Sequence, residues 1–141
     1  MLVTFCGHRN ISNAKEIKNK LFVCVEELIK RGATEFMLGG YGEFDFLAAS
    51  VVKELSGKYS YIKSILVIPY LNIKFNTELY DYSLYPPIES VPLRFAISKR
   101  NQWMVDKSDV VVSYVINSQG GSYKTLEYAI KRKKQIIEIT L

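Results

Sequence analysis

Residues 109–139 read DVVVSYVINSQGGSYKTLEYAIKRKKQIIEI, and this stretch decides the predicted fold. It begins with a run of apolar residues that is typical of a buried strand, and it ends with a second apolar run. Between the two runs, Leu126, Ala129 and Ile130 form an apolar stripe at helical spacing. The stretch therefore predicts a strand, a glycine turn, a helix and another strand, which is the repeating unit of a parallel α/β sheet.

The glycine turn of this unit is a candidate phosphate site. Gly120 and Gly121 stand at the start of the predicted helix, and the Ser122 hydroxyl is expected at its N-cap. The first N–H groups of a helix have no partner within it, and the helix dipole adds positive charge at the same point. An anion is favoured there. The alternative is an ordinary turn that uses glycine only for its backbone angles.

The same alternation of strand and helix runs through the chain. Apolar strands are predicted at 2–6, 36–38 and 65–70, and helices at 13–31, 43–55 and 94–107. The predicted fold class is α/β: a Rossmann-like three-layer sandwich, with a parallel five-stranded sheet of order 3-2-1-4-5 and helices on both faces. One domain is expected to span residues 1–141, since no linker divides them.

Residues 71–93 interrupt the alternation with three prolines and no sustained period. A long connection of this kind in a compact domain is usually a lid or a binding loop. Its tyrosines, Tyr80, Tyr82 and Tyr85, are candidates to stack on a nucleobase. Core contacts or contacts between two copies of the chain are the alternative.

Composition limits the class of protein. Of 141 residues, 48% are hydrophobic and 23% are charged, which is typical of a soluble globular protein. No apolar run is long enough to span a bilayer, and the N-terminus lacks the long apolar region of a signal peptide, so a cytoplasmic location and no membrane contact are expected. The net charge of +5 suits phosphates of any kind. The basic run at 131–134 ends a predicted helix, where cations complement the dipole.

Cysteine and histidine counts argue against a metal. Cys6 and Cys24 lie in apolar segments and are expected to be reduced core thiols. A single His with two Cys gives no recognisable ligand spacing, so no metal and no cofactor are predicted.

The ligand crevice of such a sheet should lie at the carboxyl ends of its strands, where strands 1 and 4 part. Three glycine-bearing loops should meet there, although they are far apart in the sequence: Gly7, Gly39 with Gly40, and Gly120 with Gly121. Further polar candidates stand beside these glycines, namely His8, Arg9, Gly42, Glu43 and Asp45. His8 is a general base or a hydrogen-bonded scaffold residue, and Glu43 and Asp45 bind ligand or stabilise a helix start.

Two residues are candidates for catalysis. Glu127 lies about 100° around the helix from Leu126, so it is expected to edge the crevice. There it would accept hydrogen bonds from ribose hydroxyls, or act as nucleophile or acid at a glycosidic bond; a solvated surface Glu is the alternative. Arg100, with Asn101 beside it, is placed to hold a phosphate, and a surface ion pair is the alternative.

Four motifs together resemble the SLOG superfamily of Rossmann-like proteins, and its YspA/YpsA-like branch in particular. They are FCGHR at 5–9, GGYGEFD at 39–45, RNQWMVDKSDVVVSYV at 100–115 and GGSYKTLEYA at 120–129. The resemblance covers almost the whole chain except residues 71–93. It implies a fold that binds nucleotides or nucleotide-derived ligands, often as a homodimer or larger homo-oligomer.

Within that superfamily, LOG-type phosphoribohydrolases cleave the N-glycosidic bond of nucleoside monophosphates with a helix Arg and the Glu of a G-G-x-G-T-x-x-E motif. The resemblance places Arg100 and Glu127 in those positions, whereas Thr125 lies one residue later than the threonine of the motif. Tyr123 and Lys124 stand where the enzyme motif has a glycine, which counts against hydrolysis more than against binding. The segment is also similar to nucleoside deoxyribosyltransferases, and DprA-type relatives bind single-stranded DNA.

Three functions therefore remain open. The favoured hypothesis is a nucleotide-sensing or nucleotide-sequestering protein, with phosphate on the 120–122 turn, ribose near Glu127 or Asp45, and the base under the 71–93 loop. The alternative is an enzyme that breaks or exchanges an N-glycosidic bond. Nucleic-acid binding is the least favoured, because only charge and aromatic content suggest it.

Overall fold

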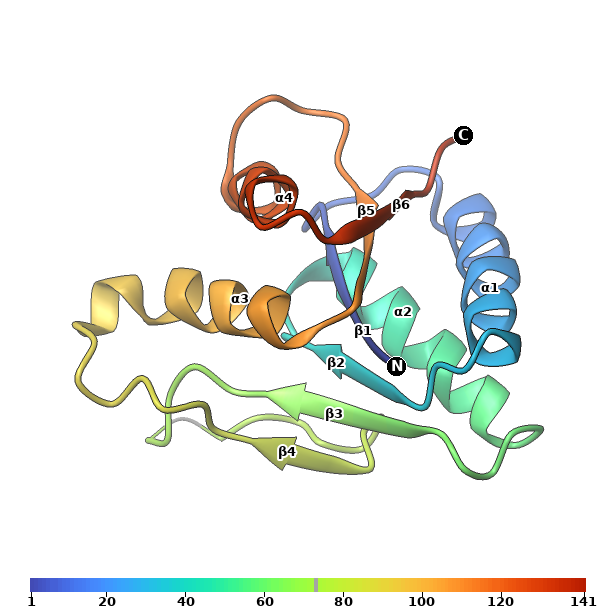
Figure 1. Ribbon diagram of the computed structural model, residues 1–141, viewed down its shortest axis with the longest axis horizontal. Helices are drawn as coiled ribbons and strands as arrows, with labels where there is room; N and C mark the ends of the chain where they lie inside the picture. Colours follow the sequence, from blue (N-terminus) through green and yellow to red (C-terminus); the bar gives the residue numbers. More distant parts are fainter. Residues whose placement is uncertain (73) are drawn as a thin grey trace.

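The computed structural model describes residues 1–72 and 74–141 and shows a three-layer α/β sandwich (Figure 1). The strands are β1 (Leu2–Gly7), β2 (Glu35–Leu38), β3 (Lys63–Val67), β4 (Tyr82–Leu84), β5 (Val110–Tyr114) and β6 (Gln135–Glu138). The helices are α1 (Ala14–Lys30), α2 (Gly42–Ser56), α3 (Ala96–Lys107) and α4 (Gly121–Lys131), with a short 3₁₀ turn at Leu93–Phe95. The α/β class and the Rossmann-like architecture predicted from the sequence are confirmed.

The sheet is parallel throughout and has the order β4-β3-β2-β1-β5-β6. Its last five strands reproduce the predicted order 3-2-1-4-5, but the predicted number of strands is wrong by one. The additional strand, β4, comes from the 71–93 segment and pairs with β3, Ile65 lying opposite Tyr82. Three residues are too few to show a period of two, so the sequence pattern could not reveal this strand.

Hydrogen bonds at the base of β4 explain why it joins the edge. The backbone N–H of Asp81 donates to the Ser64 carbonyl at 2.9 Å, and the Ser64 N–H donates to the Asp81 carboxylate at 2.7 Å. This reciprocal pair fixes the register of the edge strand. Position 73, within the predicted lid, lies outside the described residues.

Helices α1 and α2 cover one face of the sheet, and α3 and α4 cover the other (Figure 1). The central strand β1 divides its side chains accordingly: Val3 and Phe5 join the core beneath α1 and α2, whereas Cys6 packs with α4 on the opposite face. This alternation is the period of two that a strand imposes. Because β1 and β5 send their helices to opposite faces, the sheet parts between their carboxyl ends.

Some local predictions are corrected. Asn13 is the N-cap of α1, but its side chain makes no capping hydrogen bond. Ile130, assigned to the buried stripe of α4, is 58% exposed. The basic run begins at the end of α4 as predicted, and it is tied to Asp106 by an Arg132 ion pair at 2.9 Å and a Lys134 hydrogen bond to the backbone at 3.1 Å. None of the helices in the described residues is long and apolar enough to cross a membrane.

Candidate functional site

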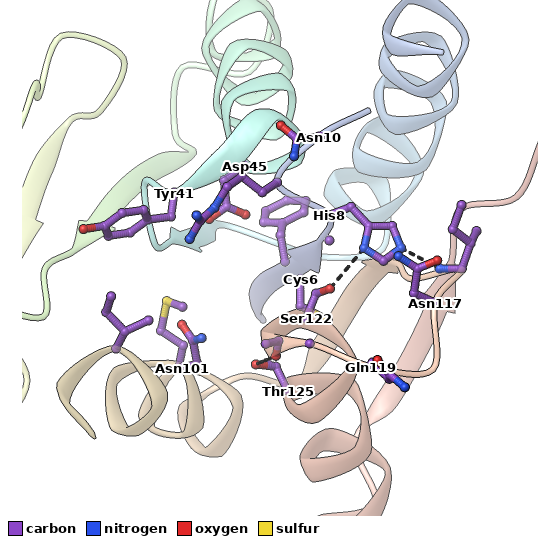
Figure 2. Close-up of a pocket in the computed structure, with 18 of the residues that line it drawn as sticks. Cys6, His8, Asn10, Tyr41, Asp45, Asn101, Asn117, Gln119, Ser122 and Thr125 are labelled. Carbon is purple, nitrogen blue, oxygen red and sulfur yellow. Dashed lines mark hydrogen bonds between the residues drawn. The ribbon is translucent and has the colours of Figure 1, made fainter. Parts of the chain in front are cut away.

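A cavity of about 470 Å³ lies at the carboxyl ends of β1 and β5, where the sheet parts (Figure 2). Most of the residues predicted for the site line it: Gly7, His8, Arg9, Asp45, Arg100, Asn101, Gly120, Gly121, Ser122 and Thr125. The structure therefore brings together residues from the ends of two strands, the start of α2, the middle of α3 and the start of α4. The other predicted residues, Gly39, Gly40, Gly42, Glu43 and Glu127, are not among those that line the cavity.

The start of α4 forms one wall of the cavity. Gly120 has φ +98°, a left-handed conformation that favours glycine, and it serves as the N-cap. The backbone N–H groups of Gly121, Ser122 and Tyr123 have no hydrogen-bond acceptor among the described residues. A Cβ atom added at Gly121 would meet nothing within 4 Å. The helix therefore presents free N–H groups to an open space, as an anion site requires.

Ser122 has a different role from the one predicted, since Gly120 takes the N-cap position. Its Oγ lies 3.3 Å from Nδ1 of His8, and Nε2 of His8 accepts a hydrogen bond of 2.7 Å from the Ile116 N–H (Figure 2). Because Nε2 is an acceptor here, the ring proton is on Nδ1 and points toward Ser122. His8 thus connects the end of β1 to both sides of the β5–α4 loop, which makes it a scaffold residue in this arrangement.

Asp45 is the carboxylate of the cavity; no other Asp or Glu of the described residues lines it. It is partly exposed, and it lines the cavity. Burial raises the pKa of its carboxyl to about 6, against the opposing effects of the Arg100 charge and of the backbone N–H groups of Tyr41, Gly39 and Gly40. Burial thus disfavours the charged form of this carboxyl more than its neighbours stabilise it.

Arg100 is 1% exposed, and its main role is structural, because its hydrogen bonds connect separate elements of the fold. Its Nη1 donates to the carbonyls of Gly39 and Val67, each at 2.8 Å, and its Nε donates to the Asn101 side chain at 2.9 Å. These bonds join the ends of β2 and β3 to α3. Nη2 makes no hydrogen bond within the described residues, so the part of this guanidinium left for a ligand is small.

Glu127 lies outside the cavity. It is exposed on α4, and its carboxylate interacts with the Tyr123 hydroxyl, which raises the pKa of that tyrosine. The sequence placed Glu127 at the crevice edge from helical periodicity alone. Periodicity gives the angle between two side chains but not which part of the helix surface meets a neighbouring element.

The glycines before α2 serve the backbone instead of the cavity. Gly39 packs against the guanidinium of Arg100, whereas Gly40 and Gly42 line a separate hollow of about 140 Å³ together with Tyr80. Glu43 lies at the helix start, where its N–H donates to the Arg9 carbonyl and its carboxylate accepts from the Ile11 N–H. This region reaches the cavity through Asp45 and Tyr41.

Sequence reasoning missed several lining residues, and Tyr41 is the most informative. It lies inside the GGYGEFD motif, is 41% exposed, and carries the Arg100 guanidinium 5.9 Å from its ring centre. Asn10, Asn117 and Gln119 also line the cavity and belong to loops that the prediction treated only as connections (Figure 2). By contrast, Tyr80, Tyr82 and Tyr85 are absent from the lining, so the base platform predicted on the 71–93 segment is not formed here.

The remaining chemistry of the cavity is limited. Burial, reinforced by the Asp45 charge, raises the pKa of the Cys6 thiol to about 12, so the thiol is protonated at neutral pH and is a poor nucleophile. No group of three His, Cys, Asp or Glu side chains that could hold a metal occurs within the residues the structure describes. What the cavity offers is hydrogen-bond donors for an anion on one wall and a carboxylate on another.

Comparison with known proteins identifies relatives in sequence and in fold. No protein-family model matches the sequence. The uncharacterized SPbeta prophage-derived protein YoqJ of Bacillus subtilis (strain 168) is 30% identical, in a match that covers 82% of this chain and 81% of YoqJ.

Several solved structures share the fold. DNA processing protein A of Helicobacter pylori, which binds single-stranded DNA, matches all of this chain and 66% of its own at 20% identity, with a TM-score of 0.71. The molybdenum cofactor carrier protein of Chlamydomonas reinhardtii matches 97% of this chain and 75% of its own at 15% identity, with a TM-score of 0.67. At these identities the likeness establishes the Rossmann-like fold alone, and the YspA/YpsA-like branch and the homo-oligomer stay predictions.

Proposed function

This chain belongs to the family of the prophage-derived protein YoqJ, and from that premise we propose that it binds a nucleotide or a nucleotide derivative in the cavity between β1 and β5. The observation that carries the proposal is the start of α4. The N–H groups of Gly121 and Ser122 have no acceptor among the described residues and border the cavity. A phosphate seated there would accept these hydrogen bonds and meet the positive end of the helix dipole.

The size and the lining of the cavity support a ligand larger than inorganic phosphate. Its volume of about 470 Å³ falls within the range of small-molecule sites. Apolar side chains of Tyr41, Ile97 and Met104 lie between polar ones, so the cavity suits a molecule with both an anionic end and a flat apolar part. A nucleoside monophosphate has both. This is a SLOG-type binding function, and the superfamily resemblance of the four motifs supports it.

Binding is favoured over cleavage of an N-glycosidic bond. The carboxylate that the family motif assigns to catalysis, Glu127, is exposed and paired with Tyr123. The proposed role of the protein is therefore to sense or sequester the nucleotide. Single-stranded DNA remains an outcome of the test, because the DNA processing protein A from H. pylori binds it on the same fold.

The test uses two substitutions of equal size at Gly121. The position has room for a side chain, so both Gly121→Asp and Gly121→Asn should fold. Asp brings a negative charge to the helix start, which stabilises the helix but repels a phosphate. We expect Gly121→Asp to weaken binding of 5′-nucleoside monophosphates by about 100-fold or more, and Gly121→Asn by about tenfold or less.

Isothermal titration with AMP, GMP, CMP and UMP, and with the matching nucleosides, provides the measurement. The proposal requires that the monophosphates bind and that the nucleosides bind much more weakly. Equal affinity of the Asp and Asn variants would contradict a phosphate at α4. Retention of single-stranded DNA without any effect of nucleotides would favour the DNA-binding alternative, and release of free base, seen by chromatography, would favour the enzyme.

A further inference from the structure

The wall of the cavity opposite the anion site carries an unusual group, the Asp45 carboxylate. A carboxylate within a site that is meant to attract a phosphate repels it, and burial makes this charge more costly still. Asp45 forms no ion pair within the described residues, because the guanidinium of Arg100 donates its hydrogen bonds to carbonyls and to Asn101. The Arg100 charge acts on Asp45 without a direct bond, so the hydrogen-bonding capacity of the carboxylate is not used by it. A partly buried carboxylate is stabilised by hydrogen-bond donors, so a ligand that supplies donors is expected at this position.

The surroundings of Asp45 fix the carboxylate without satisfying it. Backbone N–H groups of Gly39, Gly40 and Tyr41, in the turn that precedes α2, stabilise its charged form. A carboxylate offers about four acceptor positions, which is more than these three donors can fill. The side that lines the cavity remains for a ligand.

We infer that Asp45 is the specificity-determining residue of the cavity and that it accepts hydrogen bonds from the vicinal hydroxyls of the ligand's ribose. The inference rests on the proposed function, because it concerns the same bound nucleotide. With the phosphate at the start of α4, the sugar is the part that carries a pair of neutral donors in all four nucleoside monophosphates, whereas among the bases only guanine has such a pair. Two adjacent hydroxyls suit the two oxygens of one carboxylate, as an isolated amine or a second phosphate does not.

A carboxylate at this position should weaken the binding of two kinds of ligand: those that lack the hydroxyls and those that carry a phosphate in place of one. A ligand without the hydroxyls leaves the Asp45 carboxylate buried beneath it and unpaired, so such a ligand binds more weakly than the loss of two neutral hydrogen bonds alone would make it. A ligand with a phosphate in place of a hydroxyl brings two negative charges together in a site of low polarity. Asp45 thus selects ribonucleotides against dideoxynucleotides and against nucleotides phosphorylated on the 3′ position.

The experiment compares three probes on two proteins. The probes are the 5′-monophosphate that binds most tightly, its 2′,3′-dideoxy analogue and its 3′,5′-bisphosphate. For the wild-type protein we expect the ribonucleotide to bind about 10- to 100-fold more tightly than the dideoxy analogue, which is the usual effect of hydrogen bonds to a charged group. For Asp45→Asn we expect that ratio to fall below about threefold and the bisphosphate to bind more tightly than it does to the wild type.

A control with the same change of net charge is Glu54→Gln, on the outer face of α2. Glu54 pairs with Lys18 at the surface, and its side chain is 53% exposed. This variant should keep the wild-type ratio. Circular dichroism establishes that each variant is folded.

The outcomes separate this inference from the proposed function. If no monophosphate binds the wild-type protein, the proposed function itself fails. If the ribonucleotide and the dideoxy analogue bind the wild type equally, or if Asp45→Asn keeps their ratio, the role of Asp45 is overturned while nucleotide binding stands.

Discussion

The two helices that begin with glycine turns, α2 and α4, use those turns in opposite ways. At the start of α2, the first N–H groups are already paired: Glu43 donates to the Arg9 carbonyl at 2.9 Å, and Phe44 donates to the His8 carbonyl at 3.3 Å. The preceding turn directs its donors at Asp45, a residue of the same helix. At the start of α4, the corresponding groups are without acceptors in the described structure.

Packing shows the same difference. A Cβ atom at Gly42 would lie 2.7 Å from the Cα of Arg9, and one at Gly40 would lie 2.7 Å from a methyl group of Leu66. A Cβ atom added at Gly120 or Gly121 would meet no residue beyond its chain neighbours and its own helix within 4 Å. Glycine before α2 therefore permits close approach of protein to protein, and glycine before α4 leaves space for something else. Two similar sequence patterns serve a structural role in one place and form an open cavity wall in the other.

The largest effect on stability should follow from Gly42→Ala. Gly42 has φ +86°, so an alanine there is strained, and its Cβ meets backbone that cannot move without displacing the β1–α1 loop. We expect a loss of about 3 kcal/mol in the free energy of unfolding. Urea denaturation followed by circular dichroism measures it. A loss below about 1 kcal/mol would contradict the close packing at the start of α2.

Asp45→Asn should have a smaller effect on the free energy of unfolding, and this effect should depend on pH. Since burial raises the pKa of Asp45 from 3.8 to about 6, the folded state binds more protons than the unfolded state between these values. The contribution of this group to stability is thus fully present below about pH 4 and is lost as the pH rises through about 6. Asp45→Asn should be more stable than the wild type at pH 7.5, by about 2 kcal/mol after a discount for partial exposure.

The free energy of unfolding should be compared between the wild type and Asp45→Asn at each pH, because other carboxyls titrate in the same range. The titratable groups that face Asp45 are Arg100, Cys6 and Tyr80, and burial raises the pKa of the last two to about 12. None of the three changes charge between pH 4 and pH 7.5. An excess stability of Asp45→Asn that is the same at pH 4 and pH 7.5 would contradict the raised pKa.

The smallest effect should follow from Gly121→Ala. The added Cβ enters open space, and the backbone of Gly121 does not have a positive φ. We expect the free energy of unfolding to change by less than about 0.5 kcal/mol. The same urea series as for Gly42→Ala provides the measurement. A loss comparable to that of Gly42→Ala would remove the distinction between the two helix starts.

Some of the candidate site could be read from the sequence because the position of the crevice follows from topology. Once alternating strands and helices imply a parallel sheet, the ends of β1 and β5 must lie next to each other, and Gly7 and Gly121 must lie near one cavity. His8 was found by the same argument, whereas Arg100 and Asn101 were chosen as polar residues in the middle of the helix before β5 that could hold a phosphate. The separation of Gly40 and Gly42 from the cavity could not be found in this way, because it depends on how the β2–α2 turn packs against Arg9 and Leu66.

Glu127 and Ile130 show the limit of periodicity. Both were placed by their angle around α4, and both are exposed. The predicted angular positions around α4 were correct, but the part of the helix surface that packs against its neighbours is narrower than expected and is formed by Leu126 and Ala129. The edge strand β4 shows a second limit, since three residues acquire strand geometry only because β3 offers them an unpaired edge.

The sequence by itself determined the parallel sheet, the order of five of its strands and the neighbourhood of the cavity, because hydrophobic period and chain connectivity are local and topological properties. Only the tertiary structure decided which glycine turn is open, which carboxylate enters the cavity and how much of Arg100 is left for a ligand. Those depend on contacts between segments remote in the chain, such as His8 with Ile116 and Arg100 with Gly39 and Val67, and no local pattern encodes their geometry.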